Sequence, residues 1–211
     1  MTILITAGPT REAIDPVRFL SNRSSGKMGY AMAEAAAEAG HRVILISGPT
    51  QLDIPDRVDY IPVESAAEMY KAVEHWIDKA EIAIFAAAVA DYRPASVPEQ
   101  KIKKTNDTMT LELVKNPDIL GSARNKFHYR GVLVGFAAET ENLEDNARGK
   151  LQSKGCNLIV ANDVSRHDIG FDTHENEVLL VFPNHTEQPA KDSKHHLAHV
   201  ILDHALDITP S

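Results

Sequence analysis

The sequence predicts an α/β fold: a Rossmann-like, mostly parallel sheet with helices on both faces, built as a single domain over residues 1–211 with a long mobile loop. Short apolar runs rich in Val, Ile and Ala alternate with helical segments of about 10–15 residues, as strands joined by crossover helices do. No repeat, linker or shift in composition divides the chain. With 43% hydrophobic and 25% charged residues, the composition is that of a globular domain with a sizeable core.

Buried strands are expected in short apolar segments that end at small or polar residues, namely Ile3–Ala7, Val43–Ser47, Ile82–Ala87, Val132–Ala137 and Leu158–Ala161. Apolar strands of this kind are typical of parallel sheets, which are covered on both faces. A late strand is expected at Glu177–Phe182, and an alternating strand at Met109–Leu113.

Helices are expected where good helix formers lie between recognisable start and stop signals. Glycines are the predicted stop signals of two of them, and a capping box formed by Ser65 and Glu68 is the predicted start of a third. The predicted helices are Lys27–Ala39 before Gly40, Ser65 to about Asp78, Leu143–Lys154 before Gly155, and the amphipathic Lys191–Leu206.

Two polar segments interrupt this regular pattern. A polar stretch runs from Thr10 to Ser25, and a longer one, Asp91–Thr108, contains two prolines and a lysine cluster. A long polar excursion inside a compact domain is usually functional or mobile. After it, Asn116-Pro117-Asp118 is expected to start a short helix, with proline in the first helical position and Asn116 as a cap.

Charge and composition exclude several classes of protein. A net charge of −8 does not attract nucleic acid. The longest apolar run, Ile82 to Ala90, is too short to span a membrane. The chain runs directly into its first strand without a basic leader, and the single cysteine allows no internal disulfide, so a cytoplasmic location is expected. No reactive signature surrounds Cys156, which we interpret as a small buried residue.

The expected ligand site lies at the carboxyl ends of the parallel strands, near the point where the strand order reverses. Small residues follow several strands there, including Gly8 after the first strand and Ala87 and Ala88 after the third. Asp91 follows in the same segment, where it is either a ligand contact or the cap of a turn. Small side chains at these strand ends leave room for a ligand.

The start of the first long helix has the spacing of a phosphate-binding turn. Ser24-x-Gly26-x-x-Gly29 is a dinucleotide fingerprint with serine in place of the first glycine, and backbone N–H groups at a helix start can hold phosphates. A Walker A loop is excluded because positions 21 and 28 hold Ser21 and Met28. An NAD site is disfavoured because no acidic residue ends the second strand.

Basic and amide residues accompany this turn. Helix capping explains Ser24 or Ser25, but it does not explain Arg18, Asn22 and Arg23 gathered over the same strand end. The loop lysines 101, 103 and 104 are either solvated charges or a local attraction for anions in a chain that is acidic overall. We favour anion binding for both groups.

Several motifs occur in an order that carries a resemblance to a known family. On these motifs, which extend over nearly the whole chain, the sequence closely resembles the bacterial form of phosphopantothenoylcysteine synthetase (phosphopantothenate–cysteine ligase). The motifs are Gly8-Pro-Thr-Arg-Glu, Asp15-Pro-Val-Arg-Phe, Ser21-Asn-x-Ser-Ser-Gly-Lys-Met-Gly29, Ala86-Ala-Ala-Val-Ala-Asp-Tyr-Arg-Pro94, Glu99-x-Lys-Ile-Lys-Lys104, Leu113-Val-Lys-Asn-Pro-Asp-Ile119, Gly135-Phe-Ala-Ala-Glu-Thr140 and Ala161-Asn-Asp-Val164.

The resemblance implies a two-step ligase of coenzyme A biosynthesis. The carboxylate of 4′-phosphopantothenate attacks the α-phosphate of CTP, with Mg²⁺, to give an acyl-cytidylate and pyrophosphate. The amine of L-cysteine then displaces CMP. The resemblance also implies a homodimer and, as a candidate partner, the flavin-dependent decarboxylase domain to which bacterial members are often fused.

The same resemblance implies roles for particular residues. Asn22 would act in forming or binding the acyl-cytidylate, and Lys101 in the cysteine-dependent step. The expected 4′-phosphopantothenate site comprises Arg18, Asn22, Ala87 and Ala88, and the metal ligands stay open. The expected nucleotide site comprises Gly8, Ser24, Gly26, Gly29, Asp91, Lys101, Asn116, Pro117, Asp118, Ile119, Phe136, Lys150 and Lys154.

Other interpretations stay open at this stage. A short-chain oxidoreductase would share the topology, but no tyrosine is followed four residues later by lysine. A non-catalytic nucleotide-binding module is the second alternative. By pattern alone, Lys150 and Lys154 would be solvated. His195 and His199 have a metal-binding spacing, but no carboxylate or cysteine ligand accompanies them in the sequence, so we interpret them as an exposed or partly packed face.

Overall fold

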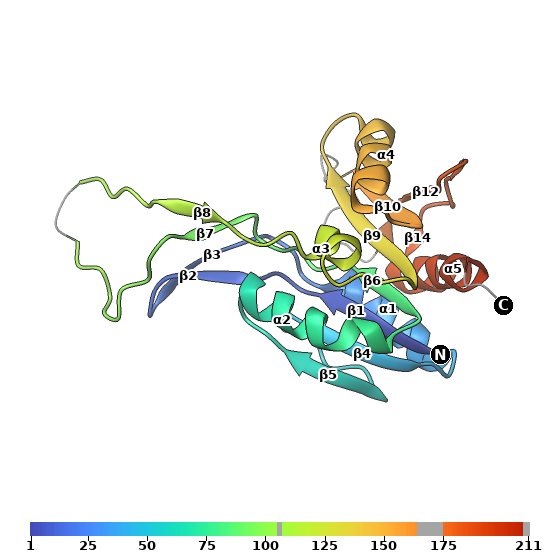
Figure 1. The fold of residues 1–211 in the computed structure, drawn as a ribbon, viewed down its shortest axis with the longest axis horizontal. Coiled ribbons are helices and arrows are strands. Elements are labelled where there is room, and N and C mark those ends of the chain that lie inside the picture. Colours follow the sequence, from blue (N-terminus) through green and yellow to red (C-terminus); the bar gives the residue numbers. More distant parts are fainter. Residues whose placement is uncertain (105–106, 164–174, 209–211) are drawn as a thin grey trace.

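The computed structural model describes residues 1–104, 107–163 and 175–208 of the chain, and its elements alternate as the sequence predicts (Figure 1). The strands are β1 (Thr2–Ala7), β2 (Arg11–Asp15), β3 (Arg18–Ser21), β4 (Arg42–Ser47), β5 (Val58–Pro62), β6 (Ile82–Phe85), β7 (Tyr92–Pro94), β8 (Leu113–Lys115), β9 (Val132–Glu139), β10 (Leu158–Asp163), β11 (Glu175–Asn176), β12 (Leu179–Val181), β13 (Thr186–Glu187) and β14 (Asp192–Ser193). The helices are α1 (Lys27–Glu38), α2 (Ala66–Trp76), the 3₁₀ helix η1 (Ile77–Lys79), α3 (Ile119–Asn125), α4 (Leu143–Lys154) and α5 (Lys194–Asp207).

One mostly parallel sheet organises the molecule, which confirms the predicted fold class. Its 8 strands lie in the order β13-β12-β10-β9-β6-β1-β4-β5. Neighbouring strands pair in parallel across β5, β4, β1, β6, β9 and β10. By contrast, β12 pairs antiparallel with β10, and β13 antiparallel with β12. The order reverses between β1 and β6, as in a Rossmann-like sheet, and ligands bind at such a point. Among the described residues, no helix combines the length and the hydrophobicity that a membrane crossing requires.

Two apolar layers cover the two faces of the sheet. Successive residues of β1 point to opposite faces: Ile3 and Ile5 pack with α1 and α5, and Leu4 packs with α2, α3 and α4. All three of these side chains are fully buried. The helices therefore fix the sheet from both sides.

The structure contains strands in two segments for which no strand was expected from the sequence. The stretch from Thr10 to Ser25 contains the β2–β3 hairpin, and Val58–Pro62 forms the edge strand β5. A hairpin outside the main sheet and a strand at its edge each leave some of their residues exposed. Neither therefore has the continuously buried residues by which the inner strands of the sheet were predicted. Most of the strand expected at Met109–Leu113 is wrong, since pairing with β7 begins only at Leu113.

Several predicted ends of elements also shift. The Ser65 hydroxyl accepts a hydrogen bond from the Glu68 N–H at 3.2 Å, which confirms that cap. The strand predicted to Ala87 ends at Phe85, and the strand predicted at Glu177–Phe182 is β12. The last helix begins at Lys194 rather than Lys191, because the Ser193 hydroxyl caps it.

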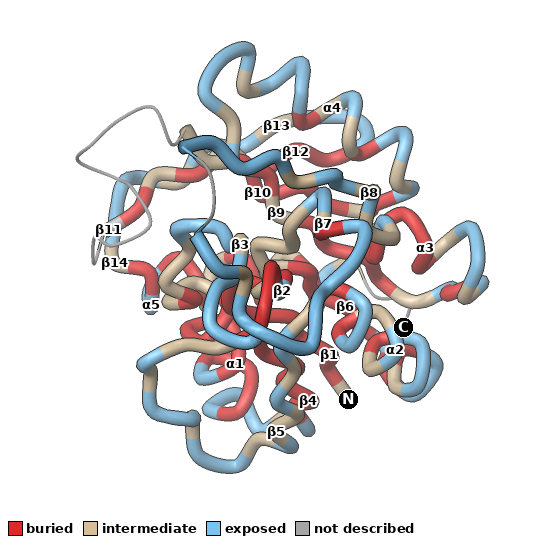
Figure 2. The backbone as a smooth tube through the Cα atoms, turned by 90° about the vertical axis from the view of Figure 1, so that its left-hand side faces the viewer, coloured by how far each residue is buried: buried red, intermediate tan, exposed pale blue. Residues whose placement is uncertain are grey.

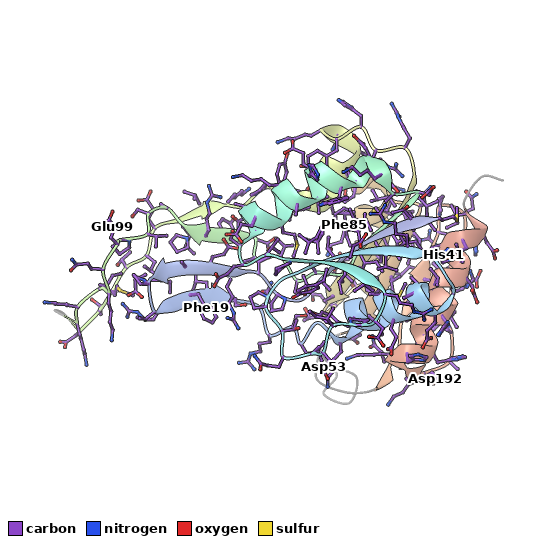
Figure 3. The ribbon with its side chains drawn as sticks, turned by 90° about the horizontal axis from the view of Figure 1, so that it is seen from below. Phe19, His41, Asp53, Phe85, Glu99 and Asp192 are labelled. Atoms are coloured by element: carbon purple, nitrogen blue, oxygen red, sulfur yellow. The ribbon has the colours of Figure 1, made fainter. Side chains whose placement is uncertain are left out.

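An arm formed by β2, β3, β7, β8 and the loop 95–112 projects away from the sheet (Figure 1). Glu99 lies near its outer end, far from Phe85 of the sheet (Figure 3). The outer loop is largely exposed, whereas most of β2 beneath it is buried (Figure 2). The long excursion predicted at Asp91–Thr108 is therefore the outer half of this arm, with residues 105–106 outside the described part.

A buried carboxylate holds the two halves of the arm together. The Asp15 side chain is fully buried and accepts hydrogen bonds from the Arg18 guanidinium at 2.6 and 3.0 Å. It also accepts from the backbone N–H groups of Val17 and Arg18, and from that of Ile102 at 3.1 Å. Arg18 foremost, with these N–H groups, lowers the pKa of Asp15 well below its usual value, although burial alone would raise it.

The two glycines of α4 predict opposite effects of substitution. Gly149 lies inside the helix with open space where a Cβ would stand, so Gly149→Ala should raise the free energy of unfolding by about 1 kcal/mol. Gly155 ends the helix with a φ of 65°, which strains any other residue, so Gly155→Ala should lower it by about 1–2 kcal/mol. Urea unfolding of both variants measures this, and equal effects would contradict the α4 boundary.

The hydrogen bond from Ile102 to Asp15 should hold in place the lysine loop, which is the part of the arm that carries Lys101, Lys103 and Lys104. In Asp15→Asn the new NH₂ group faces the Arg18 and Ile102 donors, so hydrogen exchange at Ile102 and tryptic cleavage at Lys101–Lys104 should become faster. Because the folded pKa is lowered, the wild-type tether is complete above the usual value of 3.8 and is lost only as pH falls toward the folded pKa. Asp107→Asn removes the same charge from an exposed arm position and should leave exchange unchanged. Unchanged exchange in Asp15→Asn would contradict the tether.

Candidate functional site

Two adjoining cavities lie at the carboxyl edge of the sheet, where the strand order reverses. The first has a volume of about 530 Å³ and the second about 480 Å³. Ala87, Val89 and Phe136 line both cavities, so the segment after β6 and a residue of β9 form their shared wall. This is the place at which parallel α/β sheets bind ligands.

The start of α1 faces the second cavity and has the geometry of an anion site. The helix begins after Gly26, which has a φ of 80° and no side chain to cap the first turn, so the alternative of helix capping does not account for Ser24 or Ser25. The Ser24 hydroxyl instead accepts a hydrogen bond from the Gly26 N–H at 3.3 Å. A helix N-terminus that presents backbone N–H groups to a cavity attracts phosphate oxygens.

Close packing of glycines places this helix start. A Cβ on Gly29 would lie 2.6 Å from the Ala7 Cβ, so α1 rests directly on the end of β1. A Cβ on Gly26 would lie 2.7 Å from Thr50 Cγ2 and 3.2 Å from Gly8 Cα. A Cβ on Gly8 would in turn lie 2.8 Å from the Gly48 carbonyl oxygen, so all three glycines stand where a larger residue would disturb the packing around the helix start.

Basic residues from distant parts of the chain line the second cavity. They are Arg23 and Lys27 beside the helix start, and Lys194 at the beginning of α5. Lys194 is only 8% exposed, which is unusual for lysine and places a cation inside the cavity wall. The sequence analysis missed Lys194 because its local pattern is that of an ordinary first residue of an amphipathic helix.

Asn22 lies in the wall of the second cavity, beside the segment that follows β6. Its side-chain NH₂ donates to the Ala88 carbonyl at 3.0 Å, and the Thr10 N–H donates to the same oxygen at 3.2 Å. The Ala88 N–H in turn donates to the Gly8 carbonyl at 2.9 Å. These bonds orient the Asn22 amide and bring Asn22, Ala87 and Ala88, three of the residues expected to bind substrate, into one wall.

The first cavity is lined by most of the residues expected to bind nucleotide. Lys150 and Lys154, one turn apart on α4, are each paired with a carboxylate: the Lys150 ammonium lies 2.7 Å from Glu139 Oε1, and Lys154 pairs with Asp118. Both lysines remain partly exposed and line the cavity. Besides Phe136, the other expected residues in its lining are Asp91, Asn116, Pro117, Asp118 and Ile119.

The turn before α3 corrects one expectation. Asp118 rather than Asn116 caps the helix, accepting a hydrogen bond from the Gly121 N–H at 2.9 Å, and Pro117 precedes the cap. The Asn116 side chain donates to the Ala90 carbonyl at 2.8 Å and accepts from Arg93 at 3.1 Å. Asn116 therefore joins the base of the arm to the segment after β6.

Three of the expected site residues line neither of these cavities, and one of them, Gly8, lies against Gly26 beneath the helix start. Arg18 and Lys101 line a third cavity on the arm, of about 760 Å³, together with Lys103 and Lys104. Arg18 is engaged with Asp15 and with the Ile102 carbonyl, at 3.3 Å from the latter. Within one chain, the lysine loop and the helix start thus lie at separate places, as the projection of the arm shows (Figure 1).

Cys156 is buried beside α4 and lines none of the three cavities described above. Burial raises the pKa of its thiol to about 12, which keeps it protonated at neutral pH. The interpretation as a small packed residue is therefore confirmed.

The comparison with known protein families matches residues 1–208 to the DNA/pantothenate metabolism flavoprotein C-terminal domain. The coenzyme A biosynthesis bifunctional protein CoaBC of Vibrio parahaemolyticus is 51% identical over 96% of this chain, and that of Bacillus subtilis is 53% identical over 85%. These matches cover 51% and 44% of the two relatives. The chain therefore spans about half the length of the curated relatives it matches.

Solved structures show the same fold. The C-terminal domain of a coenzyme A biosynthesis bifunctional protein CoaBC is 41% identical, with a TM-score of 0.83 over 98% of this chain and 95% of that one. The DNA/pantothenate metabolism flavoprotein from Streptococcus pneumoniae, 24% identical, has a TM-score of 0.85 over 98% and 99% of the two chains. By its match over nearly its whole length, the chain belongs to the DNA/pantothenate metabolism flavoprotein C-terminal domain family.

Proposed function

We propose that this chain is a phosphopantothenate–cysteine ligase of coenzyme A biosynthesis, with residues 1–211 forming one synthetase domain. The observation that carries the proposal is the pair of adjoining cavities. The second faces a helix start without a side-chain cap, and the first is lined by Lys115, Lys150 and Lys154. The names of the relatives support the pathway, and the match to an isolated C-terminal domain supports the extent.

The nucleotide would span both cavities across their shared wall. The turn Asn116–Ile119, Lys150 and Lys154 line one end, and the N–H groups at the start of α1, with Ser24, lie at the other. Pairing to Glu139 and Asp118 keeps the two ammonium groups in place until phosphate oxygens compete for them. The acidic protein thus concentrates positive charge where a triphosphate would lie.

The carboxylate of 4′-phosphopantothenate would approach from the side of Asn22, Ala87 and Ala88. Its oxygen forms a bond to the α-phosphorus while the bond to the β-phosphate oxygen breaks, and pyrophosphate leaves. The amine of L-cysteine then attacks the acyl carbon, the carbon–oxygen bond to the phosphate breaks, and CMP leaves with loss of one proton from nitrogen. The protein contributes positioning and charge neutralisation, because the mixed anhydride itself supplies the leaving group.

A divalent cation fits the donor set of the first cavity. Asp91 and Asp118 line it, and Mg²⁺ is usually bound by one or two carboxylates together with substrate phosphates and water. When bound with the nucleotide, Mg²⁺ would neutralise charge on the phosphates. We propose CTP as the nucleotide on the sequence motifs, with Asp91 as the carboxylate nearest the metal, since Asp118 already caps α3 and pairs with Lys154.

We also propose a homodimer in which the arm of one subunit reaches the site of the other. Of the large exposed hydrophobic residues in the described part of the chain, most lie on the arm: Val17, Phe19, Tyr92, Val97, Met109 and Leu113. Such a patch usually marks a protein interface. A partner's arm would bring Lys101 and Arg18 to the cavities from which they are separated within one chain.

The remaining half of the relatives suggests a further partner. Because their names describe a bifunctional protein and this chain matches about half of it, we propose a flavin-dependent decarboxylase domain, fused or associated, as the source of the other activity. The decarboxylase would act on the product that this ligase forms.

The direct test measures pyrophosphate release from CTP, Mg²⁺ and 4′-phosphopantothenate, with and without L-cysteine. We expect release in the first step and 4′-phosphopantothenoylcysteine, detected by mass spectrometry, only when cysteine is added. Asn22→Ala should reduce the first step about 10²–10³-fold, because it removes a positioned donor. Lys101→Gln should release pyrophosphate but form no product. Folded protein that releases none with CTP or ATP would contradict a ligase.

Mixed dimers test whether the arm acts on the partner's site. Asn22→Ala and Lys101→Gln chains, each inactive alone, should recover about a quarter of wild-type ligation when randomly paired, since half the dimers are mixed and each holds one complete site. Mixing Asn22→Ala chains with chains carrying both substitutions is the control and should recover nothing. No recovery in the first mixture, with dimers present, would show that Lys101 acts within its own chain.

A further inference from the structure

We propose that Glu38, His195 and His199 form a binding site for a zinc-class metal ion that joins α1 to α5. The site lies outside the cavities described above and does not depend on the proposed function. His195 and His199 are one turn apart on α5, the spacing that the sequence shows. The sequence gives no hint of a third ligand, because Glu38 belongs to the other end of the chain.

The structure supplies the missing carboxylate. The last turn of α1 packs beside α5 on the same face of the sheet, and this places Glu38 next to both imidazoles. Glu38 Oε2 lies 3.1 Å from His199 Nε2 and 3.5 Å from His195 Nε2. The histidines are exposed or partly packed, as interpreted from the sequence, but a carboxylate does accompany them through a contact between residues 161 positions apart.

The distances fit a tetrahedral ion. With metal–ligand bonds of about 2.0–2.1 Å, ligand atoms of a tetrahedral zinc site stand about 3.3 Å apart. Both carboxylate–imidazole distances are close to this value, and all three ligand atoms lie within 4.8 Å of one another. A small rotation of one imidazole would close the remaining edge. In the part of the chain that the structure describes, this is the one group of three or more such ligands with that spacing.

The donor set selects the class of metal. Two imidazoles and one carboxylate suit Zn²⁺, Co²⁺, Ni²⁺ or Cu²⁺, whereas Mg²⁺ and Ca²⁺ prefer oxygen ligands. All three side chains are partly exposed, at 45% for Glu38, 51% for His195 and 37% for His199, so an ion can enter from solution. Three protein ligands leave a fourth position for water or another donor.

The position of the site indicates a structural role. Glu38 ends α1, and the helix start that faces the second cavity lies 11 residues away, about 16 Å along the axis. An ion here cannot touch a ligand in that cavity, but it would fasten α1 to α5, the helix whose first residue, Lys194, lines the same cavity. Binding to the folded state alone would stabilise the fold by mass action.

The test titrates chelator-treated, full-length protein with Zn²⁺ by calorimetry and with Co²⁺ by visible absorption. We expect a saturable site, an absorption band of tetrahedral Co²⁺ and a rise in Tm with Zn²⁺. His195→Ala, His199→Ala and Glu38→Gln should each weaken binding at least about tenfold, the smallest loss seen even when an outer partner of a metal ligand is removed. Because these side chains are exposed, the variants should keep the wild-type circular dichroism.

His196→Ala is the matched control. His196 is an exposed histidine on the same helix, 3.9 Å from Asp192, which lies just before α5 (Figure 3). This variant should bind Zn²⁺ as the wild type does. Wild-type affinity in a folded His195→Ala/His199→Ala variant, or no Zn²⁺ binding and no Tm shift in the wild type, would overturn the proposal.

Discussion

The close approach of α1 to the end of β1 is the constraint on which the rest of the site depends. Gly29 lies against Ala7, and Gly26 lies between Gly8 and Thr50; a Cβ on Gly29 would clash with Ala7, and one on Gly26 with Thr50. Because of this approach, the backbone N–H groups at the helix start face the second cavity instead of solvent. The strand end, the loop before the helix and the segment after β6 can then share hydrogen bonds, and these bonds hold Asn22 against Ala88.

Charge in this protein is arranged locally rather than globally. The chain carries a net charge of −8, yet cations from α1, α4 and α5 surround the two cavities. Those on α4 are held by Glu139 and Asp118, so they are positioned before any ligand arrives. Preorganised charge of this kind costs little reorganisation when an anion binds, which favours a highly charged substrate.

The arm separates binding from the chemistry proposed for Lys101. Its base is joined to the sheet through Asn116, and its outer loop is joined to the hairpin through Asp15. Hydrogen bonds therefore connect the two halves of the arm, although the loop extends far from the cavities (Figure 1). An arm that carries both lysines and exposed hydrophobic residues suits a site completed by a second subunit.

The sequence by itself determined the parallel α/β architecture and the glycine-spaced start of α1. Periodicity and glycine spacing are local, and they depend on neighbouring residues alone. The tertiary structure decided the neighbours of Lys194 and His195, the engagement of Asn116, and the distance of Lys101 from the cavities. Those facts depend on the order of strands and on which helices share a face. Local sequence patterns show neither the strand order nor the pairing of helices, because contacts between distant residues are set by the packing of the whole sheet.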